Sequence, residues 1–385
     1  MKICFICSEY PPGKYGGIGI LVQTLARSLV HRGHEVNVIG IYAHDYPAPD
    51  FEVDMGVRVW RMREPRLRYF GWILGRWRLF RVISQLARDG EIELVDVPDY
   101  QGWAAGWASL PVPVIVHLHG SASHNAREQE RPLQRLSFWI ENWSMRRADF
   151  YRSVSLCLAR KTAELFSLMD KDIQVIYNPV EVRSYSPSSK RVLGKVVFAG
   201  TLNRNKGVIQ LISVWPKVKE ACTNAELHIF GKDWRMEEGR FMQEYLNSEF
   251  QHVIKQGVTF HGFVTRETVL NALITANVAV FPSLVEGFAL APMDAMSVGC
   301  PVIFTERASG PELIEHGKDG ILIDPENIES IADAVIRVLK DERLAAQLGR
   351  AGWEKINGKF SQEIIMSQNE KFFMDCINRF HTERR

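Results

Sequence analysis

Short apolar runs alternate with amphipathic segments along most of the chain. Lys2 to Ser8 is predicted to form a buried strand, about Ile20 to His31 an amphipathic helix, and His34 to Ile41 the next strand. Gly33 stands between this helix and that strand, a position where glycine commonly ends a helix. Alternating strands and helices are typical of parallel sheets covered by helices on both faces, so we expect an α/β fold.

The alternation continues to the end of the chain with one interruption. Further strands are predicted at 112–118, 150–153, 173–176, 195–199, 226–230, 258–262, 278–281, 301–304 and 317–323, and further helices at 71–88, 133–147, 159–169, 289–299, 328–339, 344–355 and from 361 onward. The serine-rich segment Glu181–Arg191 is typical of a linker. We therefore expect one domain over residues 1–183, a second over 192–360, and a terminal helix over 361–385.

Composition places the chain among ordinary globular proteins. Of its 385 residues 46% are hydrophobic and 24% are charged, and the formal net charge is +2. No apolar run reaches the roughly 18 residues of a membrane span, and the start of the chain has too short an apolar run for a signal peptide. The six cysteines are scattered, as in reduced cytosolic proteins, and Cys4 and Cys7 are expected to be buried strand residues. These features predict a cytoplasmic protein.

One segment, residues 58–88, has a strong positive bias. It contains nine arginines and a single acid, Glu64, with aromatic residues between them: arginines at 58, 61, 63, 66, 68, 76, 78, 81 and 88, and Trp60, Phe70, Trp72, Trp77 and Phe80. A basic amphipathic helix from about Gly71 to Arg88 fits an anionic membrane surface, and equally fits a domain helix with a solvated basic face. No nucleic-acid-binding motif accompanies it, so we expect no nucleic acid partner.

Two carboxylates, Glu286 and Asp294, stand eight residues apart in the stretch VFPSLVEGFALAPMDAMSVGCPVI. Glu286 follows the carboxyl end of a predicted strand, where open α/β sheets bind ligands, and Asp294 lies in the next predicted helix. Ionised carboxylates accept hydrogen bonds from vicinal hydroxyls, so the pair suits polyhydroxyl recognition. A solvated loop acid and a surface helix acid remain the alternative.

Two loops after predicted strands carry glycines ahead of a helix. The first, Gly13–Gly19, is not a dinucleotide fingerprint, because Val22 stands at the third glycine position. Its glycines Gly16, Gly17 and Gly19 allow backbone amides to approach an anion closely, or form a plain tight turn. The second loop, Gly200–Gly207, adds Arg204 and Lys206, which suit a diphosphate or, alternatively, a solvated surface turn.

A further candidate stands at the end of the strand predicted for Val112–Leu118. His117 and His119 would share one face of that strand. His119, followed by Gly120, is expected to be the exposed one, and His117 is expected in the core.

Taken in order, these positions resemble the retaining glycosyltransferases of family 4. Their signature, Glu-x-Phe-Gly/Ala followed by a second Glu, is matched by Glu286-Gly287-Phe288-Ala289, with Asp294 in place of the second Glu. The family's first-strand Gly-Gly-x-Gly corresponds to Gly16, Gly17 and Gly19. Its Gly-Arg-Leu followed by Lys-Gly corresponds to Gly200–Gly207, where Lys206 matches and Thr201 replaces the arginine.

The resemblance implies the GT-B fold: two Rossmann-like domains facing across a cleft, with a C-terminal helix that returns to the first. It implies retaining transfer of a sugar from a nucleotide-diphosphate sugar to a saccharide or lipid-linked acceptor, with no cofactor and no bound metal. Surface polysaccharide synthesis, at the inner face of a membrane, is the setting that the family and the basic helix suggest.

The resemblance also implies residue roles. Glu286 and His119 would hold the transferring sugar, Lys206 the diphosphate and Asp294 the ribose hydroxyls, while Arg204 would supply the charge that Thr201 lacks. Further donor contacts are implied for a set of loop residues: Gly16, Gly17, Gly19, Thr201, Gly231, Val264, Gly287, Phe288, Ala289 and Leu290. Two other classes stay open: a nucleotide-sugar epimerase of the same fold, and a non-catalytic carbohydrate- or partner-binding protein.

Overall fold

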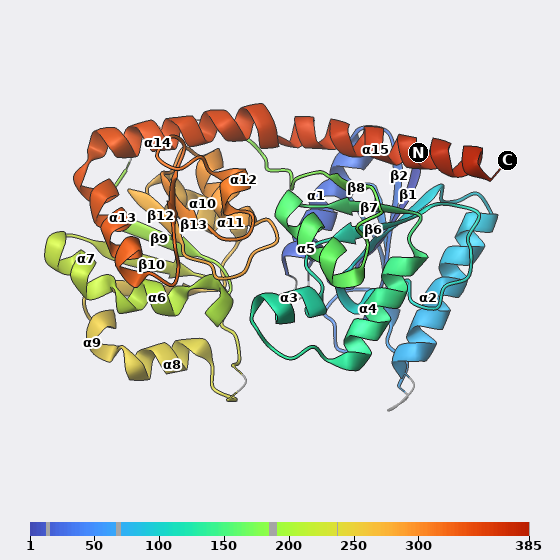
Figure 1. Ribbon diagram of the computed structural model, residues 1–385, viewed down its shortest axis with the longest axis horizontal. Coiled ribbons are helices and arrows are strands. Elements are labelled where there is room, and N and C mark those ends of the chain that lie inside the picture. The colour runs from blue at the N-terminus through green and yellow to red at the C-terminus, as the bar shows by residue number, and fades with distance from the viewer. Residues whose placement is uncertain (13–15, 67–70, 185–190, 237, 385) are drawn as a thin grey trace. The chain divides into compact units, whose positions relative to one another are not determined.

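The computed structural model describes residues 1–12, 16–66, 71–184, 191–236 and 238–384 (Figure 1). The chain divides into two compact units: unit 1 comprises Met1–Pro179 with Glu363–Arg385, and unit 2 comprises Val180–Gln362. Some residues that the sequence pattern singled out lie outside the described residues: Gly13 of the first glycine loop, Arg68 and Phe70 of the basic segment, and Ser186, Ser188 and Ser189 of the linker.

Unit 1 is built on an eight-stranded sheet in the order β3-β4-β2-β1-β5-β6-β7-β8. Only β3 and β4 pair antiparallel; the other neighbours pair parallel. The strands are β1 Lys2–Ile6, β2 Glu35–Tyr42, β3 Phe51–Asp54, β4 Val57–Arg63, β5 Leu94–Pro98, β6 Val114–Leu118, β7 Phe150–Ser153 and β8 Ile173–Val175. The central strands are buried on both faces, which is why they consist of nearly continuous apolar runs.

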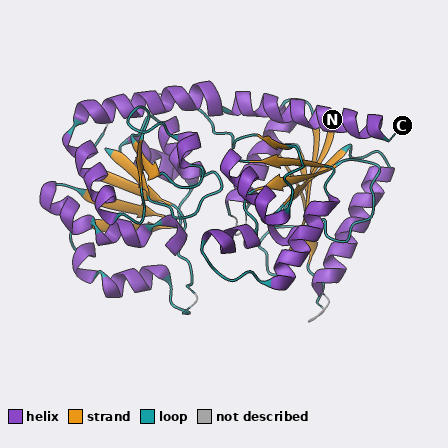
Figure 2. Cartoon of the chain, in the orientation of Figure 1, coloured by secondary structure: helices purple, strands orange, loops and turns teal. Residues whose placement is uncertain are grey.

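Helices cover this sheet, and one of them comes from the far end of the chain (Figure 2). They are α1 Gly17–His31, α2 Gly71–Arg88, the short η1 Tyr100–Gly102, α3 Ala122–Glu128, α4 Arg135–Arg147, α5 Leu156–Phe166 and α15 Gln362–Glu383. On α15, Phe373 packs edge-on against Phe5 of β1 with ring centroids 6.3 Å apart, and Glu370 pairs with Arg32 at 2.8 Å. The predicted return of the terminal helix to the first sheet is confirmed.

Unit 2 is built on a six-stranded sheet in the order β11-β10-β9-β12-β13-β14, in which every neighbouring pair is parallel. The strands are β9 Lys195–Ala199, β10 Glu226–Phe230, β11 Val258–Gly262, β12 Val278–Phe281, β13 Val302–Thr305 and β14 Ile321–Ile323. The helices are η3 Arg204–Lys206, α6 Val208–Ser213, α7 Trp215–Ala221, α8 Met242–Glu249, α9 Gln251–Ile254, α10 Arg266–Ile274, α11 Leu290–Ser297, α12 Gly310–Leu313, α13 Ile328–Lys340, α14 Glu342–Lys355 and η4 Ile356–Phe360.

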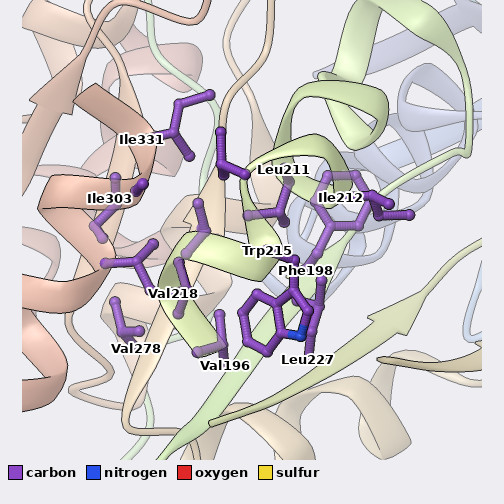
Figure 3. Close-up of a cluster of buried hydrophobic side chains, with 14 of the residues drawn as sticks. Val196, Phe198, Leu211, Ile212, Trp215, Val218, Leu227, Val278, Ile303 and Ile331 are labelled. Atoms are coloured by element: carbon purple, nitrogen blue, oxygen red, sulfur yellow. The ribbon is translucent and has the colours of Figure 1, made fainter. Parts of the chain in front are cut away.

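One face of this sheet packs into a large apolar cluster (Figure 3). Trp215 of α7 is fully buried there among Val196 and Phe198 of β9 and Leu227 of β10. Its indole N–H donates to the carbonyl oxygen of Gln256 at 3.1 Å, so its one polar group is satisfied. This core fixes the strand ends that carry the candidate site.

The helix predicted from Gly71 to Arg88 is confirmed as α2, whereas the first part of the basic segment, which was assigned no strand from the sequence, contributes to β4. Arg58, Arg61 and Arg63 lie on β4 and pair with acids of unit 1: Arg58 with Glu35 at 3.1 Å, Arg61 with Glu52 at 2.5 Å, and Arg63 with Asp50 at 2.6 Å. Arg61 is buried and also donates to the carbonyl oxygen of Pro11. The exposed arginines of the described segment are Arg66 and, on α2, Arg78, Arg81 and Arg88.

Candidate functional site

The strand order of unit 2 reverses between β9 and β12, which lie side by side at the centre of the sheet. From β9 the chain proceeds to β10 and β11, and from β12 it proceeds to β13 and β14 in the opposite direction. Ligands of open α/β sheets bind at such a point, outside the carboxyl ends of the strands. A cavity of about 70 Å³ lies there, lined by Phe198, Ala199, Gly200, Lys206, Phe281, Ser283, Glu286, Ala289, Leu290, Ala291 and Pro292.

The loops after β9 and β12 are held against each other by close backbone contacts. Gly207 has φ 72°, and a Cβ atom there would lie 1.9 Å from the carbonyl oxygen of Pro282, so only glycine fits. The backbone N–H of Leu284 donates to the carbonyl oxygen of Asn205 at 2.7 Å. These contacts fix Lys206 beside the loop that carries Glu286.

Lys206 and Glu286, both predicted site residues, form an ion pair. Lys206 Nζ lies 2.6 Å from Glu286 Oε1, and the Ser283 hydroxyl donates to the same oxygen at 2.8 Å. The Glu286 side chain is 8% exposed and that of Lys206 is 30% exposed, so the carboxylate is enclosed while Lys206 keeps some contact with solvent. The sequence did not point to Ser283.

The amino terminus of α11 borders the same cavity. Its N-cap residue, Ala289, offers no side chain to the first-turn amides, and Ala289, Leu290 and Ala291 all line the cavity. Uncapped amides at a helix amino terminus attract an anion. Phe288 is buried with its ring 5.7 Å from that of Phe360, so its side chain anchors the loop, and Gly287 joins it to Glu286.

Asp294 has a partner that the sequence did not predict. Arg266, the first residue of α10, donates from Nη2 to Asp294 Oδ1 at 2.6 Å and from Nε to Oδ2 at 3.2 Å. The Asp294 side chain is 14% exposed. Both carboxylate oxygens of Asp294 are therefore already engaged on one side by a guanidinium.

The structure does not bring Arg204 to the cavity beside Lys206. Arg204 Nη2 lies 3.1 Å from Glu238 Oε1, and its guanidinium lies 6.0 Å from the ring of Tyr245.

Three other predicted donor residues lie at strand ends of unit 2. Thr201 and Val264 are half-buried loop residues at the ends of β9 and β11. Gly231 follows β10, where a Cβ atom would lie 1.8 Å from the carbonyl oxygen of Gly200.

In unit 1 the strand order reverses between β1 and β5, and an acid follows each of these strands. After β1, Glu9 accepts hydrogen bonds from the N–H groups of Gly16 at 3.0 Å and Gly19 at 3.2 Å, at the amino terminus of α1. Gly17 is the first residue of that helix. The predicted glycine amides thus do face an anion, and in this structure the anion is the chain's own carboxylate.

After β5, Asp99 organises the backbone around His119. It is fully buried and accepts from the N–H groups of His119 at 3.0 Å and Gly120 at 3.1 Å, and burial raises its pKa to about 7. His117 is buried, as expected, and its ring lies 3.8 Å from that of the half-buried His119. Burial, with the charges of His117 and Arg152, holds the pKa of His119 well below its usual value, so His119 is neutral at pH 7.

Four polar residues escaped the sequence analysis: Glu9, Asp99, Ser283 and Arg266. Asp99 directly follows β5 and would have been identified had the strand Leu94–Pro98 been recognised. Glu9 lies in the loop after β1, directly after the strand predicted for Lys2 to Ser8. Within the described residues no group of three or more His, Cys, Asp and Glu side chains is arranged to hold a metal ion. Nor does any described helix have the length and apolar character needed to cross a membrane.

Sequence comparison assigns both units to known families. The model of the family "Glycosyl transferases group 1" matches residues 189–355, and that of "Glycosyltransferase Family 4" matches residues 15–184. An uncharacterized glycosyltransferase of Methanocaldococcus jannaschii is 28% identical over 98% of this chain and 100% of its own length. A glycogen synthase of Mycobacterium tuberculosis is 24% identical over 97% of this chain and 94% of its own length.

Solved structures share the fold. Sucrose-phosphate synthase from Thermosynechococcus elongatus superposes with a TM-score of 0.82 at 21% identity, covering 98% of this chain and 99% of that one. Anabaena HepE, solved in complex with UDP, superposes with a TM-score of 0.73 at 18% identity, covering 97% of this chain and 100% of that one.

Proposed function

Because the chain belongs to the group 1, family 4 glycosyltransferases with the GT-B fold, we propose that it transfers a hexosyl or related sugar from a nucleotide-diphosphate sugar to a saccharide or lipid-linked acceptor, with retention of configuration and without a bound metal. The observation that carries this proposal is the cavity at the β9–β12 reversal. There, Lys206 and the uncapped amino terminus of α11 face the same space. A cation and helix amides together suit the phosphates of such a donor.

The departing diphosphate would be stabilised by charges already in place. Its negative charge grows as the glycosidic bond breaks, and preorganised donors aimed at such developing charge are among the largest contributions to catalysis. Lys206 is bonded to Glu286 in this structure, so a phosphate oxygen would replace one carboxylate contact. Glu286, still held by Ser283, would then accept hydrogen bonds from hydroxyls of the transferring sugar.

His119 is assigned a hydrogen bond to a sugar hydroxyl. Because its imidazole is neutral, one ring nitrogen donates and the other accepts, which suits a hydroxyl partner. None of the residues proposed for the donor site supplies an evident covalent nucleophile. We therefore propose departure and attack on the same face of the sugar, with the leaving phosphate accepting the acceptor's proton.

A ligand screen tests the donor proposal first. Thermal unfolding with UDP-, GDP-, ADP- and dTDP-sugars and with the bare diphosphates is expected to show stabilisation by one base series, because a ligand that binds only the folded state raises its melting temperature. With an acceptor and EDTA present, NMR of the product should then show the donor's anomeric configuration. Donor turnover without any acceptor would indicate an epimerase. No stabilisation by any of these compounds would favour a non-catalytic binding protein.

We also propose that unit 1 docks on an anionic membrane surface, where a lipid-linked acceptor for surface polysaccharide would be found. Helices α2 and α4 flank η1: Arg76 of α2 donates to the carbonyl oxygen of Gln101, and Gly102 lies against the backbone of Ile140 on α4. Their exposed faces carry large apolar side chains, which we call the tryptophan surface: Trp72, Ile73, Trp77, Leu136, Trp139 and Trp143.

The charge of the tryptophan surface favours anionic lipid. Arg78 and Arg88 of α2 and Arg135 and Arg146 of α4 are exposed, and none of them has an acidic partner among the described residues. The acid of α4, Glu141, is turned inward and accepts from the N–H groups of Ala122 and Ser123. Tryptophan with arginine is the composition that anchors proteins at a bilayer interface.

Vesicle co-sedimentation tests this proposal. The protein should bind vesicles with anionic phospholipid at low salt and not neutral ones, and Trp139→Ala with Trp143→Ala should weaken binding about tenfold, through loss of buried apolar area. Trp234→Ala removes an exposed tryptophan of unit 2 and serves as the control. If the variant with Trp139→Ala and Trp143→Ala bound the vesicles as tightly as Trp234→Ala, or if the wild type did not bind them, the membrane proposal would be refuted. The donor proposal would be untouched.

A further inference from the structure

A groove of about 660 Å³ runs along α2 in unit 1, and none of the residues that line it belongs to the strand-end sites described above. Its apolar lining consists of Met62 of β4 and of residues of α2: Leu74, Trp77, Phe80, Val82 and Leu86. Phe80 is half-buried and packs against Trp107 with ring centroids 5.9 Å apart, so this wall of the groove is anchored to the core of the unit. The volume is typical of small-molecule sites, which occupy about 300–1,000 Å³.

Three arginines line the same groove: Arg78, Arg81 and Arg88. All three are exposed, and none has an acidic partner among the described residues. No aspartate or glutamate is found among the described residues that line the groove, and Asp89, the acid just after α2, accepts from the Gln85 amide at 2.8 Å and 3.1 Å. The positive charge of the groove is therefore not balanced within the described part of the chain.

Two of these arginines stand where they can reach one anion. An α-helix rises about 1.5 Å per residue, so Arg78 and Arg81 lie on one face of α2, about 4.5 Å apart along its axis. Like charges at this spacing slightly destabilise a helix. The Arg81 guanidinium lies over the ring of Trp77, 4.9 Å from its centroid, which leaves the N–H donors at its edge for a ligand. Phosphate oxygens accept charge-assisted hydrogen bonds from guanidinium groups, so one phosphate between the two arginines would offset their repulsion.

The composition of the lining selects among ligands. A free anion would use the arginines and leave the apolar side chains in water, and a neutral saccharide would leave the arginines uncompensated. A bilayer surface would contact exposed side chains, whereas the groove also offers the half-buried Met62, Leu74 and Leu86. A ligand with a phosphate next to a hydrocarbon chain would use both kinds of side chain, because apolar area and charge lie on the same few turns of α2.

We propose that this groove, which we call the α2 groove, binds one molecule of lipid phosphate, as part of the lipid-linked acceptor on whose proposal above this assignment rests. The phosphate of the lipid accepts hydrogen bonds from Arg78 and Arg81, and the first part of its hydrocarbon chain lies against Met62, Leu74 and Phe80. The tryptophan surface contacts the bilayer around this molecule. The α2 groove thus supplies selectivity for the acceptor's lipid phosphate, and the tryptophan surface supplies adhesion.

Titration calorimetry with a single-chain lipid phosphate tests this role. Geranyl phosphate, kept below the concentration at which it aggregates, is compared with geraniol and with inorganic phosphate. We expect geranyl phosphate to bind at least about tenfold more tightly than either, since only this ligand makes both the charge-assisted bonds and the apolar contacts. Arg78→Gln with Arg81→Gln should weaken geranyl phosphate by about tenfold or more. Leu74→Ala should weaken it without changing the affinity for inorganic phosphate.

Arg135→Gln with Arg146→Gln is the matched control. These arginines of α4 are exposed, have no acidic partner among the described residues and do not line the α2 groove. Both double variants should weaken binding to anionic vesicles to a similar extent, because each removes two surface charges. Only the α2 variant should lose affinity for monomeric geranyl phosphate. Melting temperatures check that every variant is folded.

The outcomes separate the α2 groove from the donor site. Equal weakening of geranyl phosphate by both double variants, or by neither, would overturn the inference. Equal affinities for geranyl phosphate and inorganic phosphate, or for geranyl phosphate and geraniol, would also overturn it, because the ligand would then not need both of its parts. Nucleotide-sugar binding is measured on the same preparations. If the wild type binds a nucleotide sugar but not geranyl phosphate, the role of the α2 groove is refuted and the donor proposal stands. If it binds geranyl phosphate but no nucleotide sugar, the donor proposal is refuted and the lipid-phosphate site stands.

Discussion

Replacement of Lys206 by alanine tests the proposed phosphate contact most directly. The variant removes the ammonium group that lies 2.6 Å from Glu286, and it leaves that carboxylate, 8% exposed, with the hydrogen bond that the Ser283 hydroxyl donates at 2.8 Å. A hydrogen bond to a charged group contributes about 1.5–3 kcal/mol. Because the Lys206 side chain is 30% exposed, solvent screens part of this, and we expect a loss of about 1–2 kcal/mol in the free energy of unfolding.

The effect on turnover should be larger than the effect on stability. Loss of one preorganised donor to a developing negative charge typically lowers kcat by about 10²–10³-fold. We expect Lys206→Ala to lower kcat by at least about 10²-fold, because the charge on the diphosphate grows as the glycosidic bond breaks. The assay is steady-state release of nucleoside diphosphate with the donor identified by the ligand screen, beside denaturant unfolding of the same preparation.

Two further variants make the result interpretable. In a Glu286→Gln background the stability loss caused by Lys206→Ala should shrink, since the buried charge that Lys206 compensates is gone. Lys217→Ala removes an exposed lysine of the same unit that pairs with Glu329 and Asp333, and it should leave kcat unchanged. Turnover of Lys206→Ala within about threefold of the wild type would remove Lys206 from the phosphate site.

Two predictions concern the scaffold of the sites. Gly207→Ala should lower stability by more than Gly33→Ala. Both glycines have positive φ, 72° and 86°, but an added Cβ atom would clash only at position 207, with the Pro282 carbonyl oxygen. Equal melting temperatures of the two variants would refute this prediction. The raised pKa of Asp99, about 7, means that the folded state keeps a proton that the unfolded state loses near pH 4, so stability should fall as pH rises from about 4 to 7 and level off above. Asp99→Asn should lack this part of the decline, and a pH profile of unfolding parallel to the wild type's would contradict the assignment.

The sequence predicts the strands of unit 2 better than those of unit 1, for a physical reason. Lys195–Ala199, Glu226–Phe230, Val258–Gly262 and Val278–Phe281 were predicted with the bounds they have, because they are compact apolar runs bounded by glycine, proline or polar residues. In unit 1, β3 is short, and β4 alternates arginine with apolar residues, so its charges obscured the pattern. Arg61 lies in the interior, where Glu52 of the neighbouring strand balances its charge and the carbonyl oxygens of Pro11 and Pro49 accept from its guanidinium.

In the candidate site, too, some features could be predicted from the sequence and others could not. Lys206 and Glu286 could be placed together in advance, since each follows a strand end and parallel strands end at one edge of a sheet. The partners of Asp294 and of the Gly16 and Gly19 amides could not. Arg266 reaches Asp294 from a different helix, and Glu9 reaches the start of α1 across a loop, so both contacts depend on how the elements pack.

In both units, acidic side chains engage groups that an anionic or hydroxyl-bearing ligand would use. Glu286 bonds Lys206, Glu9 bonds the first amides of α1, and Arg266 bonds Asp294. An enclosed charge without a partner is costly, so these internal pairs allow the sites to stay formed before a ligand binds. The free energy of ligand binding is then the free energy of the ligand's contacts with these groups minus that of the internal pairs that the ligand replaces. A phosphate oxygen that only replaces the Glu286 contact would gain little, whereas a diphosphate that also reached the amino terminus of α11, which Ala289 does not cap with a side chain, would gain further hydrogen bonds.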